Sequence, residues 1–142
     1  MTTRQQALRV LDANINRARE GLRVSEDLVR LGFGLRRPFA HVRALRQRLN
    51  AAVRRLPVPQ ADIVASRDSL RDPGRRAVAG AVRSTEHLLL INLQRTKEAL
   101  RVLEETSRLI SPGQVAQFQR LRFDTYEVER ELFRALAALR HH

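Results

Sequence analysis

One polar group occurs twice in the sequence, and its side chains could bind a ligand. Asparagine, arginine and glutamate follow one another at intervals of three residues, first as Asn14, Arg17 and Glu20 and again as Asn92, Arg95 and Glu98. Arginine presents a planar fork of N–H donors that suits bidentate phosphate binding better than lysine does. The residue after each glutamate is small, Gly21 in the first copy and Ala99 in the second, and would leave room beside the polar side chains.

Both copies lie on stretches whose apolar spacing predicts long helices. In the first stretch one seam keeps three-and-four spacing through Leu8, Leu11, Ile15, Ala18, Leu22, Ser25 and Val29. A second seam keeps this spacing but is interrupted by Asn14, Arg17 and Gly21. Its members are Val10, Asn14, Arg17, Gly21, Val24, Leu28 and Leu31. The later stretch has the same interrupted seam, formed by Leu88, Asn92, Arg95, Ala99, Val102, Thr106 and Leu109. Because an unpaired polar side chain in a core loses several kcal/mol in desolvation, these residues need partners, solvent or a ligand, and we expect a pocket in the middle of the bundle.

The same residues also have a purely structural interpretation. Arg–Glu pairs three residues apart commonly support helices and contribute only ~0.2–0.5 kcal/mol each. Asparagine at a seam position often sets the register of neighbouring helices. The presence of the group in both copies does not decide between the interpretations, because a duplication begins with identical sequence.

The two copies belong to a longer internal repeat. Residues 14–27 align with residues 92–105 at a constant offset of 78 and without a gap. Identical pairs include Asn14/Asn92, Arg17/Arg95, Glu20/Glu98, Leu22/Leu100, Arg23/Arg101, Val24/Val102 and Glu26/Glu104. Charge is retained at Asp27/Glu105 and at Arg19/Lys97. Two copies of a helical hairpin predict an all-α bundle of four main helices with an internal pseudo-twofold axis.

Capping and helix-breaking residues predict the limits of these helices. Thr3 with Gln6 and Ser111 with Gln114 have capping-box spacing, and Pro38 and Pro112 suit a first helical turn. The expected helices cover about 3–31, 38–57, a third that begins between 75 and 85 and reaches 110, and 111–140. No sustained period-two alternation predicts a strand. The prediction is one domain over residues 1–142, with hairpin repeats at about 3–57 and 75–140 and a polar loop at 58–74.

Composition limits the function classes. The 142 residues carry a formal net charge of +12, and Lys97 is the single lysine. This charge suits nucleic acid, a membrane surface or phosphorylated small molecules, or it reflects an arginine-rich proteome with solvated helix faces. Aromatic residues make up only 4%, which disfavours single-stranded nucleic acid. The absence of cysteine excludes disulfides and thiolate chemistry, and the four histidines are too scattered for a zinc site.

The ends and the hydropathy of the chain suggest a cytoplasmic protein. The sequence contains no apolar run of roughly 20 residues and no basic-then-apolar leader, so we expect no transmembrane helix, no signal peptide and no membrane partner. His141 and His142 could belong to a purification tag and carry no argument.

Two further groups are candidates for binding. The polar loop contains Arg67-Asp68 and Arg71-Asp72-Pro73-Gly74-Arg75-Arg76, in which the backbone near Gly74 could approach a phosphate that Arg75 or Arg76 neutralises. It has no Walker motif and no GxGxxG motif, and a solvated connector is the alternative. Arg122 and Tyr126 share one face of the last helix, where Tyr126 could equally be a core-edge residue with its hydroxyl in water.

The segment from Leu11 to Asp27 resembles the opening motif of the monofunctional hydroxymethylpyrimidine-phosphate kinase domain of thiamine biosynthesis. That domain occurs alone or fused ahead of thiamine phosphate synthase, and no synthase barrel follows here, which suggests the stand-alone form. Residues 92–105 resemble its second motif, and residues 121–129 resemble its closing helix. The chain departs from the pattern at Ser25, where an apolar residue is expected, and at Phe123, where tyrosine is expected; neither change removes a charge.

The resemblance implies an activity, and the interrupted seams suggest which residues serve it. Such enzymes transfer the γ-phosphoryl group of ATP to 4-amino-5-hydroxymethyl-2-methylpyrimidine phosphate, with magnesium. Because Arg17 and Arg95 interrupt the seams, we expect these two arginines to neutralise phosphates. The metal ligands would come from Glu20, Glu98, Asp27 or Asp72, directly or through water. Candidates for binding the pyrimidine or the nucleotide are Asn14, Asn16, Arg23, Asn92, Arg101, Arg67, Asp68, Arg75, Arg122 and Tyr126.

Two other functions stay open. The chain could be a non-catalytic helical partner or regulatory module of thiamine phosphate synthase, and it could form homo-oligomers. It could instead bind nucleic acid, which the scarce aromatic residues disfavour, through Arg4, Arg36, Arg37, Arg43, Arg46, Arg48, Arg54 and Arg55.

Overall fold

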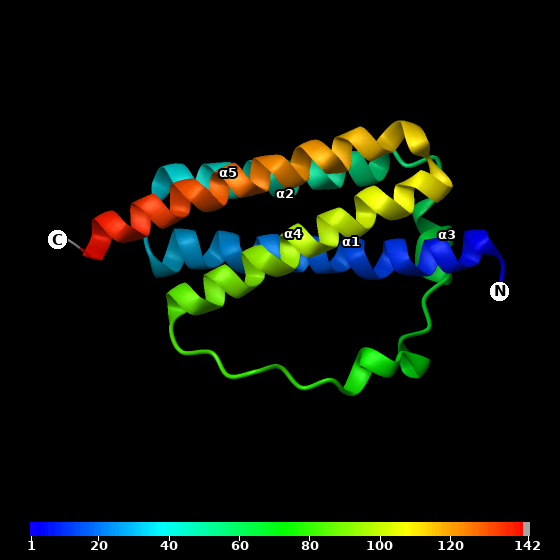
Figure 1. Ribbon diagram of the computed structural model, residues 1–142, viewed down its shortest axis with the longest axis horizontal. Helices are drawn as coiled ribbons and strands as arrows, with labels where there is room; N and C mark the ends of the chain where they lie inside the picture. Colours follow the sequence, from blue (N-terminus) through cyan, green and yellow to red (C-terminus); the bar gives the residue numbers. More distant parts are fainter. Residues whose placement is uncertain (141–142) are drawn as a thin grey trace.

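Four long helices and one short helix form the protein in the computed structural model, which describes residues 1–140. The helices are α1 (Thr3–Asp27), α2 (Arg36–Arg54), α3 (Gln60–Ala65), α4 (Thr85–Ile110) and α5 (Val115–Arg140), shown in Figure 1. The described residues contain no strand, so the all-α prediction is confirmed. His141 and His142 lie outside the described residues.

Local sequence explains where the helices begin and end. The Thr2 hydroxyl accepts a hydrogen bond from the Gln5 backbone N–H, and the Gln5 side chain accepts one from the Thr2 N–H, so the capping box lies one residue before the predicted one. The Ser84 hydroxyl caps α4 by accepting from the His87 N–H. After α1 the chain makes a π-helical turn at Leu28–Gly32 and reverses at Gly34, whose φ of 65° favours glycine.

Three predicted boundaries were wrong. Helix α2 begins at Arg36, so that Pro38 lies within its first turn. The predicted loop at 58–74 contains α3 and 3₁₀ turns at Ser69–Arg71 and Pro73–Arg76, because short helical turns leave little periodic signal. The Ser111 side chain makes no capping hydrogen bond, although Pro112 does begin a 3₁₀ turn at Pro112–Gln114, just ahead of α5.

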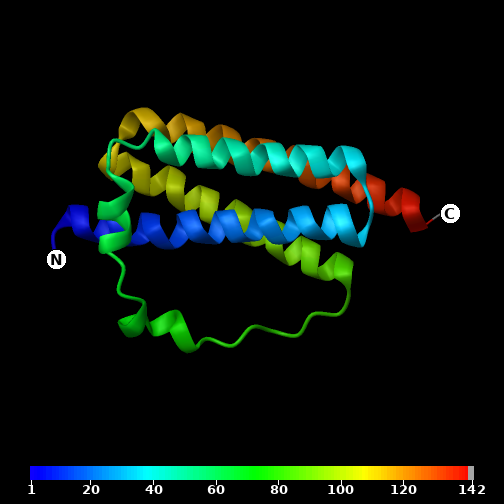
Figure 2. The ribbon, with the colours of Figure 1, turned by 180° about the vertical axis from the view of Figure 1, so that it is seen from behind.

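The core lies where the two long hairpins meet. Helix α1 crosses α4 and packs on it extensively, α5 packs along α4, and α2 packs against α1 and α5, as Figures 1 and 2 show from opposite sides. The predicted apolar seam of the first helix is confirmed, because every one of its seven residues is buried: Leu8, Leu11, Ile15, Ala18, Leu22, Ser25 and Val29. None of the helices in residues 1–140 combines the length and the apolar character needed to cross a membrane.

In each hairpin, one ion pair to a buried glutamate joins the long first helix to the second helix. Arg46 of α2 binds Glu26 of α1 bidentately at 2.6 and 3.1 Å, and Arg122 of α5 binds Glu104 of α4 bidentately at 2.8 and 3.3 Å. A buried carboxylate requires such a partner. Glu26 and Glu104 are equivalent positions of the predicted repeat, and the matching contacts are in keeping with a duplication, which stays a prediction from sequence.

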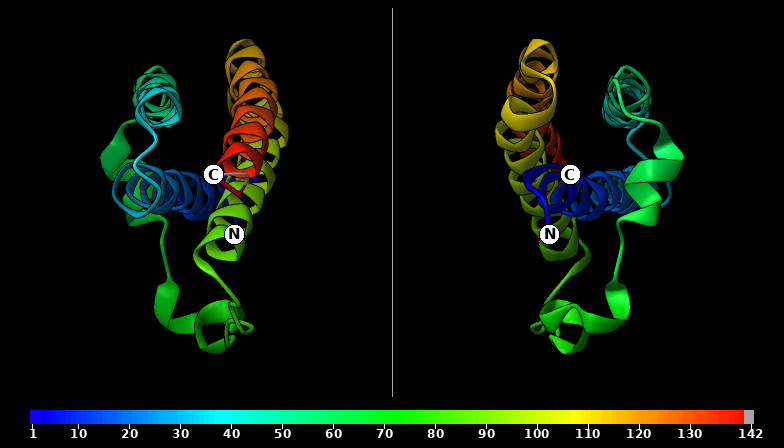
Figure 3. Two further views of the ribbon diagram at one scale, coloured as in Figure 1. Left: turned by 90° about the vertical axis from the view of Figure 1, so that its left-hand side faces the viewer. Right: turned by 90° about the vertical axis from the view of Figure 1, so that its right-hand side faces the viewer.

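The connection from α3 to α4 runs along one side of the bundle. Residues 66–84 pass on the α1–α4 side of the molecule, away from α2 and α5, in all the views of Figures 1, 2 and 3. This connection therefore lies beside the helices that carry the repeated polar group.

Candidate functional site

The repeated polar groups meet at one cavity between α1 and α4. Its volume is about 530 Å³, and it is lined by Asn14, Arg17, Glu20, Gly21, Asn92, Arg95, Glu98, Ala99 and Val102. All six members of the two groups and both small residues thus line the same space. The crossing of α1 and α4 brings them together, since each helix contributes the equivalent four positions of the predicted repeat.

The two asparagines are buried and are fixed by their own helices. The Asn14 Nδ2 donates to the Val10 carbonyl and the Asn92 Nδ2 donates to the Leu88 carbonyl, both at 2.9 Å. These bonds use the amide nitrogen of each asparagine and leave its Oδ1, an acceptor, for another partner. These bonds do not cross between helices, so neither amide sets the register of α1 against α4.

The charged residues of the group are available to a ligand. The Arg17 Nη1 donates to the Asn14 Oδ1 at 3.4 Å. Arg17, Arg95, Glu20 and Glu98 are exposed, and within residues 1–140 none of the four forms an ion pair with another residue. The expected Arg17–Glu20 and Arg95–Glu98 helix-supporting pairs are thus absent from the described part of the chain. Two arginines and two glutamates therefore line the cavity without an ion-pair partner among the described residues.

Gly21 also allows α1 and α4 to approach each other closely. A Cβ atom on Gly21 would overlap the Thr96 hydroxyl and lie 3.0 Å from the Asn92 carbonyl oxygen. Thr96 is fully buried, and its hydroxyl donates to the same carbonyl at 2.9 Å. Gly21 therefore lines the cavity and determines the separation of α1 and α4.

A second cavity adjoins the first at the loop. It has a volume of about 710 Å³, and Asn14, Arg17 and Val102 line both cavities. The remaining lining residues belong to the chain start, to the first half of α1 and to the loop: Met1, Gln6, Arg9, Val10, Asp12, Ala13, Asn16, Arg67, Asp68, Ser69, Asp72 and Pro73. The predicted candidates Asn16, Arg67, Asp68 and Asp72 therefore lie in this second space.

The loop is tied to α1 at this cavity by one ion pair. Arg67 donates to both carboxylate oxygens of Asp12 at 2.8 and 2.7 Å. This hydrogen bonding raises the pKa of Arg67 above its ordinary value. Asp12 is buried, and the sequence analysis missed it, although a carboxylate on the buried side of a helix is itself a signal that a cationic partner is needed.

Six predicted site residues lie outside both cavities: Arg23, Asp27, Arg75, Arg101, Arg122 and Tyr126. Arg122 instead pairs with Glu104 and donates to the Tyr126 hydroxyl at 3.0 Å, and these bonds raise its pKa. Arg23 lies 3.6 Å from both Glu26 and Asp27, and Arg101 lies 3.3 Å from Glu104. The structure gives most of these residues partners within the fold, away from the cavities.

The carboxylates of the first cavity suit a magnesium ion. Glu20 and Glu98 both line this space. Within residues 1–140 no three His, Asp or Glu side chains form a ready-made metal cluster. Magnesium usually keeps several waters and takes one or two carboxylates together with phosphate oxygens. The two glutamates fit that kind of coordination, which a phosphorylated ligand would complete.

Similarity to known proteins places the chain in a family. Residues 9–131 match the ThiD2 family, and this range contains both polar groups. The chain belongs to the ThiD2 family. This ThiD2 chain resembles thiamine-phosphate synthases of Gloeobacter violaceus (39% identity, covering 88% of this chain and 36% of the relative) and Synechocystis sp. (40% identity, 85% and 34%). It is also 36% identical to that of Nostoc punctiforme, covering 90% of this chain and 36% of the relative.

The ThiD2 chain spans about a third of the length of these curated relatives. No solved structure matches it. The resemblance seen in the motifs is thus confirmed at the level of the family, and the relatives are proteins of thiamine biosynthesis.

Proposed function

We propose that the chain transfers the γ-phosphoryl group of ATP to 4-amino-5-hydroxymethyl-2-methylpyrimidine phosphate, which yields the corresponding pyrophosphate and ADP. Family membership and the thiamine-phosphate synthase relatives support a role in thiamine biosynthesis, and the resemblance of the first motif favours this reaction within it. The observation that carries the proposal is the cavity at the helix crossing, where two arginines and two glutamates face a ligand space without ion-pair partners of their own among residues 1–140.

For this reaction the protein has mainly to neutralise the charge of the two substrates and to align their phosphates. A phosphate oxygen of the pyrimidine phosphate forms a bond to the γ-phosphorus, while the bond from that phosphorus to the β–γ bridging oxygen breaks and ADP leaves with the electron pair. Because the second pKa of a phosphate monoester is about 6, the attacking group is already deprotonated at neutral pH and needs no general base. Electrostatic repulsion between the two anionic substrates is the main obstacle.

The residues of the first cavity are suited to overcome this repulsion. Arg17 and Arg95 approach from different helices and would neutralise the phosphates of donor and acceptor. Glu20 and Glu98 would hold magnesium, which supplies further positive charge at the transferred group. Since the Asn92 Nδ2 is bonded to the Leu88 carbonyl, we assign its Oδ1 to the 4-amino group of the pyrimidine rather than to a phosphate oxygen.

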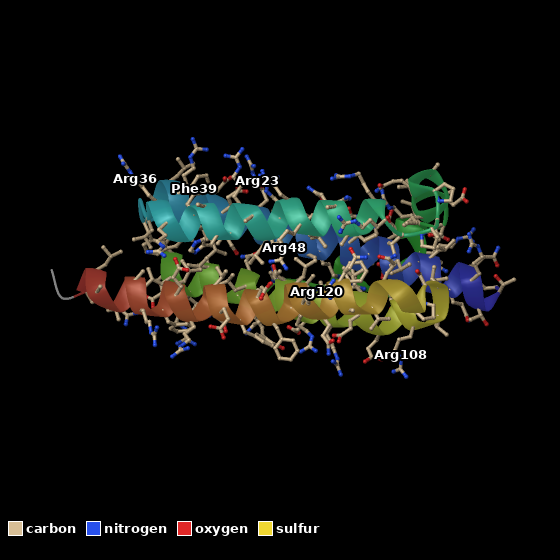
Figure 4. All side chains as sticks on the ribbon, turned by 90° about the horizontal axis from the view of Figure 1, so that it is seen from above. Arg23, Arg36, Phe39, Arg48, Arg108 and Arg120 are labelled. Atoms are coloured by element: carbon tan, nitrogen blue, oxygen red, sulfur yellow. The ribbon has the colours of Figure 1, made fainter. Side chains whose placement is uncertain are left out.

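The arginines outside the cavities do not all lie on one side of the molecule. Figure 4 shows Arg23 and Arg36 at one edge of the bundle and Arg108 at the opposite edge. A duplex binder concentrates its basic residues on one face. Six of the eight arginines considered for nucleic-acid binding lie on α2, so charge reversal on this helix tests that alternative.

The direct test combines purified protein with ATP, magnesium and the pyrimidine phosphate, and follows products by ³¹P NMR. We expect a pyrophosphate product and one ADP for each product molecule. The absence of product, with the protein folded by circular dichroism, would favour the non-catalytic role beside thiamine phosphate synthase.

A further inference from the structure

We infer that the two adjoining cavities divide the substrates between them: the larger one binds the nucleoside end of ATP, the smaller one binds the pyrimidine phosphate, and Arg17 contacts the phosphates of both. This inference rests on the proposed function and specifies which part of the site binds each substrate.

The position of Arg17 at the boundary is the first support. Arg17 and Asn14 line both cavities, whereas Arg95 lines only the smaller one. The Arg17 guanidinium is held by the Asn14 Oδ1, and Asn14 is itself fixed to the Val10 carbonyl. Phosphoryl transfer requires donor and acceptor phosphates in contact, and the boundary is where ligands of the two cavities would meet.

The lining of the larger cavity is the second support. Val10, Ala13 and Pro73 offer apolar surface for a flat base, and Asp68, Asp72 and Ser69 offer oxygens for ribose hydroxyls. Apart from the shared Arg17, two arginines face three aspartates in this cavity, and Arg67 is already paired with Asp12. The uncharged nucleoside therefore suits this space better than a triphosphate, whose negative charge is directed to Arg17 at the boundary with the smaller cavity.

The asymmetry of the site is the third support. The two polar groups present equivalent residues from α1 and α4, yet donor and acceptor differ chemically. Asp12 of the first copy corresponds to Leu90 of the second, so only α1 has the carboxylate that binds Arg67 of the loop. The loop lies on this side of the bundle (Figure 3) and lines the larger cavity only, so the two cavities differ where they would have to bind different ligands.

Separate binding measurements test this division without turnover. ADP and the pyrimidine monophosphate are each titrated calorimetrically into the magnesium-containing protein. Ala13→Trp from α1 and Ser69→Trp from the exposed loop would each fill the larger cavity, and Ala61→Trp on the exposed surface of α3 is the matched control. We expect the first two variants to weaken ADP binding at least tenfold and to leave pyrimidine phosphate binding within twofold.

The arginines give the complementary result. Arg95→Ala should weaken only the pyrimidine phosphate, and Arg17→Ala should weaken both ligands. Unchanged ADP affinity in both tryptophan variants would overturn the inference, and so would an equal weakening of ADP and pyrimidine phosphate binding in those two variants. The absence of ADP binding by the unmodified protein would also overturn it. If the unmodified protein forms product but the tryptophan variants keep their ADP affinity, the kinase proposal holds and the division of the cavities is wrong. If ADP binds in the larger cavity but no product forms, the kinase proposal is wrong and the nucleotide site remains.

Discussion

Gly21 of α1 lies directly against Thr96 of α4, and no side chain larger than hydrogen fits between them. The contact determines how closely the two helices cross, and with it the distance between the arginines that line the cavity. The site and the core are therefore coupled at this point.

Gly21→Ala should destabilise the protein, although glycine-to-alanine changes within helices usually stabilise by up to about 1 kcal/mol. The added methyl group would overlap the buried Thr96 side chain, so we expect a loss of about 1–3 kcal/mol in the free energy of unfolding, measured with urea. Gly32→Ala is the control, since its nearest neighbour would lie 3.6 Å away. Equal effects of the two changes would show that helix spacing does not depend on Gly21.

Arg122→Leu should lower stability and not substrate affinity. It leaves the buried Glu104 with only the exposed Arg101 at 3.3 Å as a cationic partner, so we expect a loss below the roughly 3–5 kcal/mol of a fully unpaired buried charge. The double variant Arg122→Leu/Glu104→Leu should lose less than the sum of the single changes in urea unfolding. Arg48→Leu, which breaks the exposed pair with Asp124, should cost less than about 1 kcal/mol. If the Arg122→Leu protein keeps its stability but binds substrate more weakly, Arg122 contributes to substrate binding after all.

Arg17→Ala and Arg95→Ala should each lower kcat/KM by about 10²–10³-fold, because each removes a charge-bearing donor near the transferred phosphoryl group. Their free energies of unfolding should change by less than about 0.5 kcal/mol, since neither arginine is buried or ion-paired in the described chain. Arg43→Ala on the exposed side of α2 should change neither quantity. Full turnover in both site variants would show that the cavity is not the catalytic site.

Removal of magnesium with EDTA should abolish turnover, and added magnesium should restore it. Glu98→Gln and Glu20→Gln should raise the magnesium concentration needed for half-maximal rate, because each removes a carboxylate ligand. Glu127→Gln, which changes an exposed carboxylate far from this cavity on α5, is the control. An unchanged magnesium dependence in both site variants would place the metal elsewhere.

Charge reversal on α2 separates the kinase from a nucleic-acid binder. Arg36→Glu with Arg43→Glu should leave kcat/KM within twofold, because these residues lie outside both cavities. Binding to a labelled duplex should be weak in the unmodified protein and fall steeply with salt. Tight duplex binding that the two reversals abolish would support the basic-surface alternative.

Periodicity was sufficient for the helices and for the core face of α1. The three-and-four spacing predicted the seam from Leu8 to Val29, and all of it is buried. It failed for α3 and the 3₁₀ turns of the connecting loop, which are too short to establish a period. Six of the predicted site residues lie outside the cavities because the residue types alone do not show which side of a helix or loop faces the α1–α4 crossing.

The sequence alone determined the all-helical architecture, the family and the two equivalent polar groups, since all three follow from residue types at fixed spacing along the chain. Only the tertiary structure decided that Arg17 and Arg95 line the same space, that Asp12 holds the loop through Arg67, and that Arg122 pairs with Glu104. These are contacts between residues distant in sequence. They depend on the angle and separation at which the helices pack, which no single helix specifies.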